Sequence, residues 1–398
     1  MGKFAENIVF VTSRTLHQKT AVSMRPIAHC NALSSICNKV RYVVLSRKNE
    51  IHMNSQYWDR YKMGEDFDVS VLKSPVSDKF RYKKYVDLIS HFLYALFFIV
   101  KMRKSKLNNY LFYSFSYNDL LPYVFLYAFY KKQNRPIFRF EIAHFPAQNN
   151  FIFDFVLKRC DKAFVETSLL RDKLVQSNEN AKNRIEVLRN SPINVTLEHM
   201  QSLTKENARK IIENNYELTL PEKIICFSGT FYKNQKAIEI MIESVSLLGE
   251  QVKFIVIGGM SEDDVEYYRK YIISKGISNI DFVGFVSPND VKYFIASADI
   301  LLLYYSSETR LKYWSPVKMH EYMAAGRVII ASEFDELGEV LVHNKNALFV
   351  KRDDVKDLYK SIENALSNDE LSQELSMNAL KDARNYTLEE RVRRIAEI

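Results

Sequence analysis

The sequence predicts an α/β protein made of two Rossmann-like domains, each built on a parallel sheet. Three observations lead to this prediction. The chain has 398 residues, which is enough for two domains of ordinary size. Short β-branched or apolar runs alternate with helix-like runs almost from end to end, which is typical of parallel strands covered by helices. Charge and glycine are also distributed unequally between the two halves.

The first half is basic and the second half is acidic. Residues 1–200 contain 31 Lys and Arg and 17 Asp and Glu, whereas residues 201–398 contain 25 and 31. The difference predicts domains that face different partners, and the basic half would suit nucleic acid, an anionic membrane or a phosphorylated substrate. Hydrophobic residues at 47% and charged residues at 26% exclude a wholly disordered or fibrous protein.

The first half reads as one α/β set. We expect strands at 7–12, 40–46, 67–72, 110–116, 136–141, 162–166 and 185–188, and helices around 22–37, 82–104 and 119–133. The first strand follows Lys3 and Glu6 directly, so we expect no signal peptide.

The second half repeats the alternation. We expect strands at 224–228, 253–257, 281–283, 300–304, 328–331 and 347–350, and helices at 236–248, 262–275, 288–297, 316–325 and 353–367. The two sets join near 191–220. Because ligands of such sheets bind beyond the carboxyl ends of the strands, we expect the site in a cleft between the two domains.

The sequence offers little for a metal or a disulfide framework. Its four cysteines have no CxxC spacing and no histidine cluster beside them, so reduced thiols in a cytosolic core are expected. The tripeptide 66–68 is a D-x-D, but it opens an ordinary strand. No other carboxylate and histidine cluster has metal-ligand spacing, so we expect no metal site.

The longest apolar run is FLYALFFIV at 92–100, and it is flanked by lysines and arginines on both sides. It is too short to span a bilayer, which takes about 20 apolar residues. Two readings stay open: a helix buried in the protein core, or a helix that lies on an anionic leaflet through 79–106.

The most specific segment is SPVKMHEYMAAGRVIIAS at 315–332. Ser315 is a good N-cap, Pro316 fits the first helical position, and Gly326 is a natural C-cap. The free N–H groups of such a helix start would suit a phosphate. Lys318 and Glu321 lie on one face near that start, where they are either a surface pair or a nucleotide contact.

This segment resembles the nucleotide-sugar signature of retaining GT-B glycosyltransferases, family 4. The resemblance implies that Ser315, Pro316, Val317 and Lys318 contact the diphosphate of the donor and that Glu321 contacts its ribose. Family members often carry a second glutamate eight positions earlier, where this chain has Tyr313. Glu308 lies close by in the sequence and is a candidate to replace that glutamate.

Three further segments are similar to the same family. CFSGTFYKNQK at 226–236 resembles its strand, glycine and lysine element, which implies that Gly229, Lys233 and Lys236 hold the diphosphate. EIAH at 141–144 resembles an E-x-x-H element, which implies a catalytic role for His144. For Lys236 the alternative is an exposed lysine at a helix start, and for His144 a structural histidine. The sequence around 189–191 resembles the crossing between domains.

The resemblance covers residues 110–398 and implies three parts. Residues 1–195 would form an acceptor-binding domain, 196–380 a donor-binding domain, and 381–398 a helix that packs back on the first domain. In the first domain, the loop after the first strand has no glycine, unlike many family members. Its Arg14, His17 and Lys19 are candidates for an anionic acceptor, or are solvated loop charges.

The resemblance therefore implies a metal-independent, retaining hexosyltransferase with catalytic His144, Lys236 and Glu321. The donor would be a UDP or GDP sugar, with no separate cofactor. The acceptor would be a glycan or a lipid-diphosphate-linked glycan of surface polysaccharide assembly, which implies a cytoplasmic protein, peripheral at the cell membrane. The alternatives are a basic nucleic-acid-binding protein, although no known RNA or DNA motif appears, and another GT-B enzyme such as a nucleotide-sugar epimerase.

Overall fold

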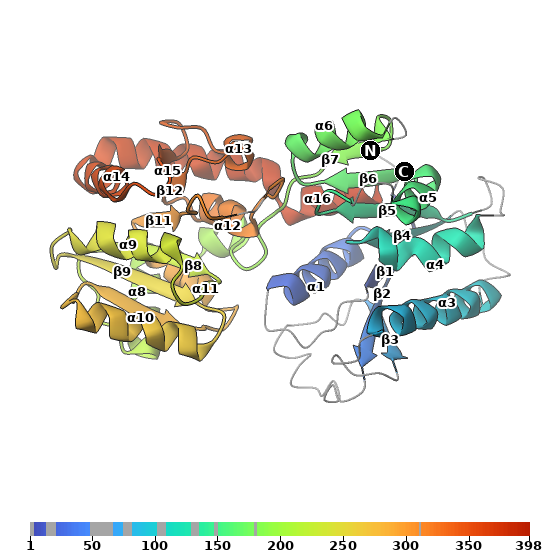
Figure 1. Cartoon of the computed structure of the whole chain (residues 1–398), viewed down its shortest axis with the longest axis horizontal. Helices are drawn as coiled ribbons and strands as arrows, with labels where there is room; N and C mark the ends of the chain where they lie inside the picture. Colours follow the sequence, from blue (N-terminus) through green and yellow to red (C-terminus); the bar gives the residue numbers. More distant parts are fainter. Residues whose placement is uncertain are drawn as a thin grey trace. The chain divides into compact units, whose positions relative to one another are not determined.

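The computed structural model describes residues 4–12, 21–47, 67–74, 82–101, 109–128, 135–146, 150–178, 181–309 and 312–398. The chain divides into two compact units (Figure 1). Unit 1 contains Met1–Arg189 and Leu388–Ile398, and unit 2 contains Asn190–Thr387. The first division falls earlier than the predicted residue 195. At the start of unit 2, Asn190 donates from Nδ2 to the carbonyl of Ser315 (2.5 Å).

The second division falls later than the predicted residue 380. The helix α15 (Asp369–Ala383) still packs on α12 (Val317–Ala325) of unit 2, and the Tyr386 ring lies 5.0 Å from that of His320. The chain returns to unit 1 only at α16 (Leu388–Ala396), whose Val392 and Ile395 are buried in the core of that unit.

Unit 1 is built on a parallel sheet. Among the described residues its seven strands are β1 (Asn7–Thr12), β2 (Lys39–Arg47), β3 (Asp68–Ser74), β4 (Tyr110–Ser114), β5 (Ile137–Ile142), β6 (Lys162–Val165) and β7 (Ile185–Val187), in the order β3-β2-β1-β4-β5-β6-β7. In β1, Val9 lies opposite Arg41 of β2 and Phe112 of β4. Nearly every residue of β1 is buried, as expected for a strand covered on both faces.

The helices of unit 1 that are described are α1 (Ala21–Ser34), α3 (Lys83–Lys101), α4 (Tyr117–Tyr127), α5 (Phe151–Arg159), α6 (Ser168–Ser177) and α16. Three of them begin where a polar side chain accepts from a free N–H of the first turn: Ser116 for α4, Asn150 for α5 and Thr167 for α6. In the part of the chain that the structure describes, no helix is long and apolar enough to cross a membrane.

Unit 2 repeats the plan with six described strands. They are β8 (Lys223–Gly229), β9 (Val252–Gly258), β10 (Ile280–Gly284), β11 (Ile300–Leu303), β12 (Val328–Ser332) and β13 (Leu348–Val350), in the parallel order β10-β9-β8-β11-β12-β13. Side chains of β8 alternate between two core clusters, with Ile225 and Phe227 in one and Ile224 and Cys226 in the other. This sheet is therefore covered by apolar side chains on both faces.

The helices of unit 2 are α7 (Leu197–Gln201), α8 (Lys205–Tyr216), α9 (Lys236–Ser246), α10 (Glu262–Ser274), α11 (Val291–Ser297), α12, α13 (Asp335–Gly338), α14 (Val355–Ser367) and α15. A strand and a helix alternate along most of this unit, as the sequence predicts. The α/β class with two parallel sheets is confirmed. All four cysteines are free, and Cys37 alone among them is partly exposed.

Candidate active site

The candidate site lies at the carboxyl edge of the unit 2 sheet. β8 ends at Gly229, Tyr304 and Tyr305 follow β11, and Asp353 lies just beyond β13. Because β8, β11, β12 and β13 are parallel neighbours, their carboxyl ends meet at one edge of the sheet. The helix α12 begins after the loop that leaves β11, so its start belongs to the same edge.

The start of α12 differs from the prediction. Pro316, rather than Ser315, is the N-cap, and the helix begins at Val317. Ser315 is occupied elsewhere, since its carbonyl accepts from Asn190 and its Oγ lies 3.2 Å from Nε2 of His320. Proline has no side-chain acceptor, so no side chain caps the first turn of α12. The Met319 N–H donates to the Pro316 carbonyl (3.0 Å), so the earlier N–H groups of this turn and its positive dipole end are available to an anion.

Lys318 places a cation beside this helix start. Its Nζ lies 4.4 Å from the ring centroid of Phe227 and 4.9 Å from that of Tyr305. Burial lowers the pKa of Lys318 to about 7, although the Glu321 carboxylate opposes the shift. Among the described residues, the Lys318 ammonium makes no hydrogen bond or ion pair. A half-buried amine whose nearest described partners are ring faces is poised to accept an anion.

Gly229 leaves the space in which Lys318 lies. A Cβ atom at this position would be 3.1 Å from Lys318 Nζ and 3.3 Å from the Phe227 ring. The neighbouring Gly258 has a left-handed φ of 110°, and a Cβ there would lie 2.1 Å from the Gly229 carbonyl oxygen. The two glycines therefore allow backbone, ring and ammonium to come together at the end of β8.

Glu321 is buried on the same helix. Its Oε1 accepts from the backbone N–H of Asn194 (2.8 Å) and of Ile193 (3.4 Å). Burial raises the pKa of Glu321, and these two hydrogen bonds oppose the rise. The carboxylate thus fixes the segment that enters unit 2, while its contact with a ribose stays a prediction.

Lys236 is the second cation of the region, and it is already paired. Its Nζ lies 2.8 Å from Oδ2 of Asp353, and this hydrogen bond raises the pKa of Lys236. Asp353 has a left-handed φ of 62° and also accepts from the backbone N–H of Ser307 (3.1 Å). Burial alone would raise the pKa of Asp353, but Lys236 and Ser307 lower it overall. The sequence prediction did not include Asp353. Its position as a polar residue just past the end of a predicted strand could have identified it as a candidate.

The remaining candidates are more loosely placed. Lys233 is exposed, and its backbone N–H donates to Asp264 Oδ1 (2.9 Å). His144 is exposed just past β5 of unit 1. Tyr313 has a left-handed φ of 64° and donates its backbone N–H to Glu336 (2.7 Å), while Glu308 is exposed. The loop residues Arg14, His17 and Lys19 lie outside the described residues.

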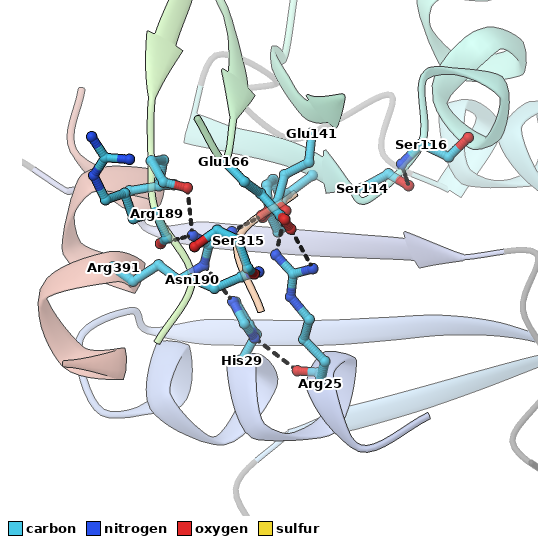
Figure 2. A network of polar contacts seen from close by, with 12 residues as sticks. Arg25, His29, Ser114, Ser116, Glu141, Glu166, Arg189, Asn190, Ser315 and Arg391 are labelled. Carbon is cyan, nitrogen blue, oxygen red and sulfur yellow. Dashed lines mark hydrogen bonds and ion pairs between the residues drawn. The ribbon is translucent and has the colours of Figure 1, made fainter. Parts of the chain in front are cut away.

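Unit 1 contains a buried charge network that sequence reasoning also missed (Figure 2). Oε2 of Glu141 lies 2.6 Å from Arg25, and its Oε1 pairs with Arg391 of α16. Arg391 donates from Nε to Nε2 of His29 (3.0 Å), and Nδ1 of that ring donates to the Arg25 carbonyl (2.7 Å). Arg25 also pairs with Glu166 at 3.0 Å.

The charges in this network are fixed by burial and by one another. Burial alone would raise the pKa of Glu141, but the charges of Arg25 and Arg391 outweigh this effect and lower the pKa to about 2. Burial lowers the pKa of His29 to about 3, so the ring is neutral at physiological pH. Glu141 therefore serves to hold α16 in place, and in the E-x-x-H element only His144 is exposed.

Comparisons with known proteins agree with this architecture. Residues 222–368, which contain the β8 loop and α12, match the family model described as Glycosyl transferases group 1. The matched residues are somewhat over a third of the chain and lie within unit 2. An uncharacterized glycosyltransferase of Methanocaldococcus jannaschii is 22% identical over 254 residues, which is 63% of this chain and 62% of that protein.

Two further likenesses are to one curated enzyme and one solved structure, and the latter shares the fold. The N,N'-diacetylbacillosaminyl-diphospho-undecaprenol alpha-1,3-N-acetylgalactosaminyltransferase of Campylobacter jejuni is 24% identical over 151 residues, 38% of each chain. The crystal structure of Anabaena HepE in complex with UDP and glucose has a TM-score of 0.69 at 12% identity, and covers 99% of this chain and 98% of that one. The match spans less than two thirds of either curated relative.

Proposed function

We propose that this GT-B protein transfers a sugar from a nucleotide-diphosphate sugar to a glycan or lipid-linked glycan. The observation that carries the proposal is the Lys318 ammonium, enclosed by Phe227 and Tyr305, next to Gly229 and the uncapped start of α12. This cationic site lies within the region that matches the glycosyltransferase family model.

The proposed chemistry depends on where negative charge develops during the reaction. As the glycosidic bond of the donor breaks, negative charge develops on the leaving diphosphate. Lys318 and the N–H groups at the start of α12 would stabilise that charge more strongly in the transition state than in the ground state. Lys236 and Lys233 would add positive charge from the β8 loop, and Glu321 would bind the ribose. The charge would be neutralised by protein groups, without a metal.

Retention of the anomeric configuration and the role of His144 rest on the resemblance to family 4. That resemblance implies front-face attack by the acceptor on the sugar, with His144 near the transferred group. The donor class is supported by the likeness to HepE, whose structure holds UDP and glucose. We therefore propose a UDP or GDP sugar as the donor.

A lipid-diphosphate-linked acceptor is supported by the Campylobacter relative, whose name specifies a diphospho-undecaprenol substrate. The segment 79–106 contains eight Lys and Arg and one acidic residue, which suits an anionic leaflet. We propose that the protein works at the cytoplasmic face of the cell membrane in surface polysaccharide assembly.

The test is a thermal-shift screen with UDP, GDP and a panel of their sugars, followed by transfer assays with the donor that stabilises most. Lys318→Met should lose most of the shift, while Lys360→Met, on the exposed side of α14, should keep it. NMR of the product anomer tests retention. Stabilisation by RNA or DNA with a steep salt dependence, or turnover of the donor without an acceptor, would contradict the proposal.

A further inference from the structure

The helix α3 buries polar side chains and exposes apolar ones. Its buried side carries two titratable residues, Asp87 (5% exposed) and His91 (2%), together with Ala95 and Phe98. A helix on the surface of a water-soluble domain normally places such groups outward and apolar groups inward. The outward side of this helix is therefore the feature that needs an explanation.

The orientation of α3 is fixed by packing on its inner side. The Phe98 ring lies 5.3 Å from that of Phe112 in β4 and 5.9 Å from that of Tyr110. The His91 ring lies 6.4 Å from that of Tyr123 in α4. The helix packs against α4 and β3 within unit 1 (Figure 1). Rotating α3 to bury its outer side would break these contacts.

The outward side is a continuous apolar stripe. Tyr85, Ile89, Leu93, Leu96 and Val100 follow one another at helical spacing and are 68%, 58%, 63%, 47% and 62% exposed. Within the described part of α3, no charged side chain is exposed between them. Scattered exposed apolar residues are ordinary, but an aligned set of this length marks an interaction surface.

The charge around the stripe selects the partner. Lys79, Arg81, Lys83 and Lys84 precede it in the sequence, and Lys101, Arg103, Lys104 and Lys106 follow it. The single acidic residue between these flanks, Asp87, is buried on the inner side. We propose that the outward face of α3 inserts into the surface of an anionic phospholipid membrane, with the basic flanks at the headgroups.

The packing also sets how the helix meets the lipid. One long side of α3 is covered by α4 and β3, so only the opposite side can enter the bilayer surface. The helix has 19 residues and is about 28 Å long, and it would lie in the plane of the interface. Membrane binding by α3 is argued independently of the proposed function. Only its role, to bring the chain to a lipid-linked acceptor, rests on that function.

The test uses the full chain and vesicles of phosphatidylcholine, with or without about 30% phosphatidylglycerol. The ionic strength is roughly physiological. We expect flotation with the anionic vesicles and weak flotation with the neutral ones. Ile89→Glu with Leu93→Glu should lower the partition coefficient by at least about tenfold. The matched control is Ile273→Glu, an exposed apolar position of α10 in unit 2, and should not change it.

A second measurement does not depend on the charged variant folding. Leu93→Trp keeps an apolar side chain and reports its surroundings by fluorescence. We expect a blue shift on addition of anionic vesicles and quenching by brominated lipid. Absence of quenching, or equal flotation with neutral vesicles, would overturn the proposal. So would a dimer in solution that Ile89→Glu with Leu93→Glu dissociates, because the stripe would then bind a second copy of the chain.

The same preparations separate this inference from the proposed function. Nucleotide-induced thermal shifts are measured without vesicles, and flotation is measured without nucleotide. Flotation that depends on Leu93 but no response to UDP or GDP would leave the membrane surface standing and reject the transferase. A normal nucleotide response without any flotation would reject the membrane surface and leave the proposed transferase standing.

Discussion

Lys318 predicts a specific pH dependence of nucleotide binding. Burial between Phe227, Tyr305 and the end of β8 lowers its pKa to about 7, so the free protein holds it partly neutral at physiological pH. A bound diphosphate would favour the charged form, so binding would take up a proton. With a free-state pKa near 7, about half of the side chain is protonated at pH 7 and about one hundredth at pH 9.

The affinity for a nucleoside diphosphate should therefore fall by roughly tenfold between pH 7 and pH 9, and by about fiftyfold at most, which is the ratio of the protonated fractions. The phosphates themselves ionise near pH 6, so the charge of the ligand is nearly constant across this range. Isothermal titration calorimetry with UDP and GDP, repeated in buffers of different ionisation enthalpy, measures both the affinity and the proton uptake.

Lys318→Met should flatten this profile. At pH 7 its affinity should be lower than that of the wild type by roughly tenfold or more, because a charge-assisted hydrogen bond is lost. The two affinities should converge as the pH approaches 9. A wild-type affinity that does not change with pH, or the same slope in Lys318→Met, would refute the assignment of the ammonium to the diphosphate.

Three further predictions concern the other charged groups. Lys236→Ala should lower transfer by at least about tenfold with an unchanged melting temperature, and unchanged steady-state kinetics would remove Lys236 from the site. Glu321→Ala should weaken nucleotide binding and also lower the melting temperature, because the N–H groups of Ile193 and Asn194 lose their acceptor; equal calorimetric affinity would reject the ribose contact. Arg391→Met should cost about 3–5 kcal/mol in urea unfolding because it leaves the buried Glu141 carboxylate short of a partner, and a loss under 1 kcal/mol would contradict that role.

Much of the fold follows from local sequence patterns. Asn7–Thr12 has the predicted bounds, and most other strands differ by a residue or two at an end. These strands are buried on both faces, so their apolar runs are continuous and easily recognised. The end of α12 is equally local, since Gly326 adopts a left-handed φ of 57° as predicted for a C-cap.

The site is less predictable because its contacts are not local. Ser315 is a good N-cap by composition, yet its carbonyl accepts from Asn190, which lies 125 positions earlier. Asp353 pairs with Lys236 across 117 positions, and Arg391 reaches Glu141 across 250. No spacing rule in a single sequence brings such residues together, whereas the resemblance to a family identifies the segments without their pairing.

The acidic charge of residues 201–398 is compatible with an anion site because charge acts locally. Two carboxylates beside the strands are already paired: Asp353, just past β13, with Lys236, and Asp299, just before β11, with Lys205 and Arg209. Exposed charges farther than about 10 Å away are screened by salt. Lys318 has no such carboxylate partner among the described ion pairs and is partly desolvated, so its interaction with a phosphate would be weakly screened. The affinity of unit 2 for a diphosphate should therefore depend on this one residue more than on the net charge, and added exposed acids on α14 or α15 should change it little.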